Sequence, residues 1–153
     1  MSRSCLVALT LSLSSLTLCA AEGPFAALDP RAINIRLPAD IQWKTSSSGA
    51  SEATLVGDPS QQGLYVVLTK WAAHHNSHPH FHPNDRFITV LSGTWWVATG
   101  RKYDPDQMKP VPAGSFVTHY AKQVHYDGAK DGDVILEIVG MGPETPTDRK
   151  SVV

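Results

Sequence analysis

The feature that most constrains this chain is a regular succession of short apolar runs separated by glycine- and proline-containing turns. The runs are rich in β-branched and aromatic residues, which favour strands. No window after the first two dozen residues sustains a helical period. The stronger runs are LYVVLTKW (64–71), RFITVL (86–91), TWWVAT (94–99), SFVTHY (115–120) and DVILEIVG (133–140), and weaker ones are IQW (41–43) and ATLVG (53–57). This pattern predicts an all-β sandwich or barrel that forms a single domain.

The clearest local signal is the hairpin RFITVLSGTWWVATG (86–100). Two β-rich runs flank Ser92-Gly93, and glycine supplies the backbone angles that a tight turn requires. Trp95 and Trp96 are neighbours on the second run, so one should fill the barrel or line its pocket while the other lies outside. The same alternation predicts an outward position for Glu137.

The first 21 residues have the composition of a secretory signal peptide. An arginine precedes an apolar stretch from about Cys5 to Leu18, and small residues lead to a cleavage site after Ala21. The stretch is too short and too rich in serine and threonine to favour a membrane span. Lipid attachment at Cys19 is the less favoured alternative, because Leu18 is large for the preceding position. Cleavage would remove both cysteines, which predicts a thiol-free protein in the periplasm or outside the cell.

The rest of the chain divides by composition into three parts. Residues 22–52 are expected to form an N-terminal arm and the first strands, residues 53–142 the barrel, and residues 143–153 a polar, flexible tail. The formal net charge is only −1, and no basic stripe is present. Nucleic acid is therefore not an expected partner, nor is a membrane once the signal segment is removed. The expected partner is a small-molecule ligand or substrate.

The stretch HHNSHPHFHPNDR (74–86) holds five of the chain's histidines within nine residues. Its prolines favour an extended backbone, in which alternate side chains share a face. His80 and His82 could then bind one ion together, and a third imidazole from a distant strand would complete the site. His119 and His125 are the candidates for that third ligand. His78 is a doubtful neighbour, while the two histidines that open the stretch are expected to lie in a loop.

Two motifs in this region resemble those of the cupins, which are small jelly-roll β-barrels that bind a metal inside. The first family motif, G-x5-H-x-H-x3-E-x6-G, is similar to His80-x-His82-x3-Arg86-x6-Gly93. The second, G-x5-P-x-G-x2-H-x3-N, is similar to Gly114-x5-Tyr120-x-Lys122-x2-His125. Both match without a gap and in the family's order, and the resemblance spans about residues 64–140. It implies a single-domain barrel that holds one divalent transition metal (Fe, Zn, Cu, Ni or Mn) by His80, His82 and His125.

The departures from the family pattern concern the site directly. Arg86 stands where the family has a metal-binding glutamate, and a guanidinium stays protonated and does not ligate metals. Tyr120 and Lys122 replace the proline and glycine of the second motif, and Ala129 replaces its asparagine.

Three interpretations of Arg86 remain open from the sequence. The site could be a three-histidine centre with open positions for water or substrate. His119 could supply a fourth ligand. Arg86 could instead face outward or pair with Asp85 in a structural role. An inward Arg86 would be a natural anchor for a carboxylate or another anion beside the metal.

Two functions from different classes fit this pattern. The preferred one is a metalloenzyme with dioxygenase-like, isomerase, lyase or other Lewis-acid chemistry on a small anionic or aromatic compound. Arg86 and Tyr120 are its candidate catalytic groups, although packing is the favoured role for Tyr120. The alternative is a non-catalytic module that binds a metal or a small ligand. The resemblance also raises the expectation of a homodimer.

Overall fold

The computed structural model describes residue 25 and residues 27–46, 49–144 and 147–148. The chain separates into two units, Met1–Arg36 and Leu37–Val153. The described part of the first unit contains turns and an ion pair between Arg31 and Asp29. The predicted signal segment 1–21 lies outside the described residues. Within the part of the chain that the structure describes, no helix is long and apolar enough to cross a membrane.

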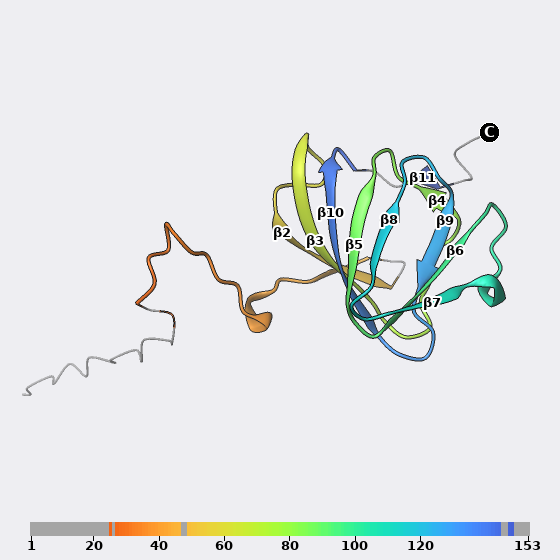
Figure 1. Cartoon of the computed structure of the whole chain (residues 1–153), viewed down its shortest axis with the longest axis horizontal. Helices are drawn as coiled ribbons and strands as arrows, with labels where there is room; N and C mark the ends of the chain where they lie inside the picture. Colours follow the sequence, from red (N-terminus) through yellow and green to blue (C-terminus); the bar gives the residue numbers. More distant parts are fainter. Residues whose placement is uncertain (1–24, 26, 47–48, 145–146, 149–153) are drawn as a thin grey trace, which may run out of the picture. The chain divides into compact units, whose positions relative to one another are not determined.

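The second unit is built from two antiparallel β-sheets that face each other (Figure 1). The larger sheet has the order β1 (Lys44–Thr45), β2 (Ala50–Val56), β3 (Gly63–Trp71), β10 (Val134–Gly142), β5 (Arg86–Ser92) and β8 (Phe116–His119). The smaller sheet has the order β11 (Thr147–Asp148), β4 (His80–Phe81), β9 (His125–Gly128), β6 (Thr94–Thr99) and β7 (Lys109–Pro112). Among the described residues, the helical elements are two 3₁₀ turns, η1 (Pro38–Asp40) and η2 (Pro105–Gln107). The predicted all-β class is confirmed.

Alternation along the strands produces the core between the sheets. In β3 every second residue from Tyr65 to Trp71 is buried, and β10 shows the same pattern from Val134 to Gly140. Each large apolar side chain buried in this way stabilises the fold by about 1.5–3 kcal/mol. The buried apolar cluster contains Ala50, Tyr65, Val67, Trp71, Ile88, Val90, Trp95, Ala129, Val134, Leu136 and Ile138.

The β5–β6 hairpin has the predicted turn and the predicted tryptophan alternation. Gly93 has φ +76°, and a Cβ there would overlap the carbonyl oxygen of Asp133 and lie 3.1 Å from the Cα of Val134. Trp95 is 1% exposed and packs in the core, whereas Lys130 Nζ lies 4.1 Å from the ring centroid of Trp96. The two tryptophans therefore face opposite sides of the sheet.

The structure adds strands that the sequence patterns do not reveal. The strands β4, β9 and β11 span only two to four residues, so they carry too little alternation to be recognised. The strand β7 contains Pro110 and Pro112 and lies at the edge of its sheet, where missing N–H donors are tolerated. The first strands lie before residue 53, since β1 spans Lys44–Thr45 and β2 starts at Ala50 and pairs with Trp71.

Candidate metal centre

Three imidazoles converge between the sheets from β4, the following loop and β9. His80 and His125 are directly paired residues of β4 and β9, and His82 follows His80 by two positions. The ring centroid of His80 lies 4.8 Å from that of His82 and 4.6 Å from that of His125. The potential ligand nitrogens of all three lie within 4.8 Å of one another. The three residues are 9%, 4% and 6% exposed, so the centre is shielded from solvent.

The Nδ1 atom of each ring has an acceptor, which fixes the same tautomer in all three. His80 Nδ1 donates to the carbonyl of His78 at 2.7 Å, and His125 Nδ1 donates to the carbonyl of Gln123 at 3.0 Å. His82 Nδ1 donates to the Oε1 atom of Glu144. A neutral imidazole that donates from Nδ1 carries a lone pair on Nε2. The three Nε2 atoms are therefore potential metal ligands.

The arrangement of these Nε2 atoms fits a cation. The Nε2 atoms of His80 and His82 are 3.0 Å apart, and His125 Nε2 is buried with no hydrogen-bond partner among the described residues. Two lone pairs at that separation repel each other unless a proton or a metal ion lies against them. Burial, reinforced by the charge of Arg86, lowers the pKa of His82 to about 2. Burial and His80 lower the pKa of His125 to about 4, although Asp127 opposes the shift. The rings of His82 and His125 thus disfavour protons, and the three converging Nε2 atoms suit a divalent transition metal.

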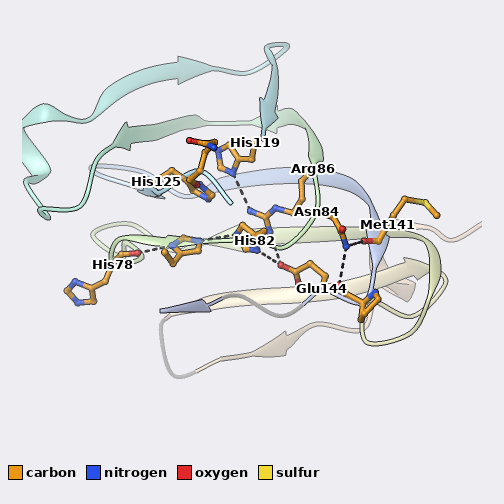
Figure 2. Close-up of polar contacts among 11 residues, drawn as sticks. His78, His82, Asn84, Arg86, His119, His125, Met141 and Glu144 are labelled. Atoms are coloured by element: carbon orange, nitrogen blue, oxygen red, sulfur yellow. Dashed lines mark hydrogen bonds and ion pairs between the residues drawn. The ribbon is translucent and has the colours of Figure 1, made fainter. Parts of the chain in front are cut away.

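Arg86 points toward this centre, so the interpretation of an outward arginine or an Arg86–Asp85 pair is wrong. Its Nη1 lies 3.5 Å from Glu144 Oε1, and its Nη2 donates to His119 Nδ1 at 3.4 Å (Figure 2). The orientation follows from the register, because Arg86 on β5 directly opposes His119 on β8. Asp85 instead accepts a hydrogen bond from the backbone of Ala121 at 2.7 Å.

Glu144 is the site residue that the sequence reasoning missed. Its side chain is 15% exposed and contacts both His82 and Arg86. The composition of residues 143–153 predicts a flexible tail, but Pro143 and Glu144 pack onto the barrel and residues 147–148 pair with β4. A lone acidic residue in a polar, proline-containing segment belongs to no motif. Only the tertiary fold could reveal its position.

His119 lies close to the centre, but it contacts Arg86 and belongs to a second group of potential ligands. Its ring centroid is 3.8 Å from that of His125, and its Nδ1 accepts from Arg86. Burial, with the nearby charges of His125 and Arg86, lowers the pKa of His119. His119, His125 and Asp127 form a second group whose ligand atoms lie within 4.8 Å of one another. A ligand role for His119 therefore remains a prediction.

The side chains of the other singled-out residues do not belong to the groups of converging ligand atoms. Tyr120 is 66% exposed and is not among the residues that line the cavity, so the structure does not bring this candidate catalytic group to the centre. Its position just after β8 turns it outward because the preceding residue faces inward. His78 is exposed, and its ring packs 5.1 Å from that of Tyr103. His74 occupies a turn with φ 65°, and the exposed His75 follows it outside any strand. Both positions agree with the predicted loop.

A cavity of about 970 Å³ opens beside the histidines. Arg86 Nε, Trp95 Nε1, Thr69 Oγ1 and Asn76 Oδ1 belong to its lining residues, and they have no hydrogen-bond partner among the described residues. Glu52 also lines it, and burial followed by the charge of Glu144 raises the pKa of this carboxyl group. The cavity therefore joins apolar walls to a few polar groups, as small-molecule sites do.

Comparisons with known proteins identify the fold. No protein-family profile matches the sequence, and no curated protein matches it. Among solved structures, the polyketide cyclase RemF from Streptomyces resistomycificus aligns with a TM-score of 0.64 at 14% identity, over 76% of this chain and 85% of that chain. A cupin-2 domain protein from Rhodospirillum rubrum gives 0.58 at 13% identity, over 75% and 78%. An RmlC-like cupin protein from Ralstonia eutropha gives 0.56 at 20% identity, over 78% and 76%.

Proposed function

We propose that this chain, which has the cupin fold, is a metalloenzyme that holds one divalent transition-metal ion through His80, His82 and His125. Its substrate in this proposal is a small anionic or aromatic compound that enters the cavity beside the ion. The observation that carries the proposal is the convergence of three buried Nε2 atoms: those of His80 and His82 lie 3.0 Å apart, and that of His125 has no hydrogen-bond partner among the described residues. A bound ion would supply Lewis-acid or redox chemistry, and its identity decides between them.

The remaining groups of the cavity have roles that do not depend on the identity of the metal. Arg86 presents a partly buried guanidinium whose Nε is unpartnered among the described residues, so it can orient an anionic group. Trp71 and Trp95 supply flat apolar walls for an unsaturated or aromatic body. The burial of the three histidines strengthens charge interactions close to their rings.

The proposal of catalysis has support from the neighbouring folds. Structures with this fold include the polyketide cyclase, a lyase for DMSP from Ruegeria pomeroyi and a sugar phosphate isomerase from Silicibacter pomeroyi. Their identities to this chain lie between 14% and 18%, so they show that this fold hosts catalysis of several kinds and indicate neither a reaction nor a substrate. The predicted leader adds a periplasmic or secreted location to the proposal.

The alternative is a non-catalytic module that binds a metal or a small ligand. Two observations favour it. The guanidinium of Arg86 already contacts Glu144 and His119, and the outward position of Tyr120 leaves the cavity without that candidate acid or base. A sensor or carrier needs only the ion and the cavity.

The test is a screen of the metal-loaded protein against small carboxylates and phenols. Calorimetry measures binding, and mass spectrometry with an oxygen electrode detects conversion. An enzyme should convert at least one bound compound, and His125→Ala should abolish that conversion. Compounds that bind tightly and are never converted would favour the binding module. Conversion that survives His125→Ala unchanged would contradict the assigned centre.

A further inference from the structure

The carboxylate of Glu144 lies at the junction of the metal centre and the arginine. Its Oε1 atom accepts from Nδ1 of His82 and lies 3.5 Å from Nη1 of Arg86. The three side chains are 15%, 5% and 11% exposed, so water competes weakly for these contacts. Figure 2 shows Glu144 reaching both partners from the segment that follows β10.

We propose that Glu144 is a positioning residue for the metal centre, acting through His82 and held in place by Arg86. The carboxylate contacts the nitrogen of His82 that faces away from the other imidazoles, and it is not among the atoms that converge as ligands. It therefore holds the ring in the Nδ1–H tautomer and directs the Nε2 lone pair toward the ion. Carboxylates that bind a ligating histidine in this way also raise its basicity as a ligand. The inference rests on the proposed metal centre.

The position of Glu144 is set by backbone contacts that are independent of His82. Its N–H donates to the carbonyl of Pro59 at 2.6 Å. Just before it, Asn84 Nδ2 donates to the carbonyls of Met141 at 2.8 Å and Pro143 at 3.2 Å. Beyond it, Thr147 and Asp148 pair with Phe81 and His80 of β4. The C-terminal segment is thus anchored on both sides of Glu144. Backbone contacts therefore place the carboxylate at the site, independently of its own charge interactions.

The contact between Glu144 and Arg86 also explains how an arginine is compatible with a cation site. The guanidinium of Arg86 occupies the position where the resemblance places a ligating carboxylate, and an unbalanced positive charge there would repel a divalent ion. Glu144 lies against both His82 and that guanidinium, so its charge offsets the charge of Arg86. In this chain the carboxylate of Glu144 lies behind His82, one of the proposed ligands, and is not itself among the ligand atoms.

The first test needs no metal. In the metal-free, full-length protein, nitrogen NMR of the imidazoles should show His82 as the Nδ1–H tautomer. In Glu144→Leu, which removes the acceptor, the Nε2–H form of His82 should become populated. Wild-type His82 found as the Nε2–H tautomer would overturn the proposal. So would a tautomer that Glu144→Leu leaves unchanged.

The second test is the affinity for Zn²⁺, measured by competition with a chelator on the full chain. Glu144→Gln should weaken binding by about 10–100-fold, which is the usual effect of removing such a partner. The matched control is Glu137→Gln, because Glu137 lies on the opposite face of β10 from the buried Leu136 and Ile138 and should change the affinity less than twofold.

The outcomes separate this inference from the proposed function. If the wild-type protein binds Zn²⁺ and Glu144→Gln binds it equally well, the positioning role is overturned and the metal centre stands. If the wild-type protein does not bind Zn²⁺, the metal centre fails and the role of Glu144 fails with it. Weaker binding in Glu144→Gln together with the tautomer change in His82 supports both.

Discussion

Replacing Arg86 by methionine tests how the interior charges of the site are balanced. Methionine keeps much of the length of the side chain but leaves the carboxylate of Glu144 with His82 as its remaining side-chain partner, and His119 Nδ1 without a donor. Removing one partner of a buried ion pair costs about 3–5 kcal/mol. The Nη1–Oε1 distance of 3.5 Å and the 11% and 15% exposures lower this figure. We expect Arg86→Met to reduce the free energy of unfolding by about 2–4 kcal/mol.

The assay is urea denaturation of the metal-free protein at neutral pH, followed by tryptophan fluorescence. A double-mutant cycle with Glu144→Gln isolates the pair, because Arg86→Met should cost less once the carboxylate is gone. We expect a coupling free energy of about 1–3 kcal/mol. A coupling below about 0.5 kcal/mol, the level at which independent sites add, would refute the claim that Arg86 and Glu144 form a unit.

Two further predictions concern the packing at Gly128 and the ionisation of the buried Tyr65. Gly128→Ala should lower the free energy of unfolding by about 1–3 kcal/mol, because a Cβ there would overlap the carbonyl of His75 and lie 2.6 Å from the Cα of Asn76. The control is Gly132→Ala, because a Cβ at Gly132 would have no neighbour within 4 Å. This control should be nearly neutral in the same urea titration. Burial and the charge of Glu144 raise the pKa of Tyr65 to about 12 from its usual 10.0, so the folded state holds this proton more tightly than the unfolded chain does. The stability from this group is complete below pH 10 and should fall by roughly 2–3 kcal/mol as the pH rises toward 12, a loss that should be missing from the pH profile of Tyr65→Phe.

The fold was largely predictable because its long strands carry clear alternation. The run at 64–71 became β3 (Gly63–Trp71), and the run at 94–99 became β6 with the same bounds. Such strands have one buried face, and period two follows directly from that. The strand β4, with two residues, has no period to detect, although it carries His80. Its place is set by pairing with β9 and β11, which lie far away in the sequence.

The candidate site was predictable only in part. His80, His82 and His125 were found because their spacing matches two motifs, and the structure brings their rings together. The inward direction of Arg86 was left open, because a motif position does not say what the side chain meets. The contribution of Glu144 could not be predicted, since its contacts to His82 and Arg86 span more than fifty residues and depend on how the segment after β10 crosses the barrel.

The measurement that tests the central claim most directly is the metal content of the untagged, full-length protein after saturation with Zn²⁺ and desalting. Plasma mass spectrometry should find one ion per chain in the wild-type protein and almost none in His80→Ala, His82→Ala or His125→Ala. His78→Ala is the matched control, because this exposed side chain lies outside the group of converging ligand atoms, and it should retain the ion. A wild-type protein without metal, or a control that loses as much metal as His82→Ala does, would contradict the account.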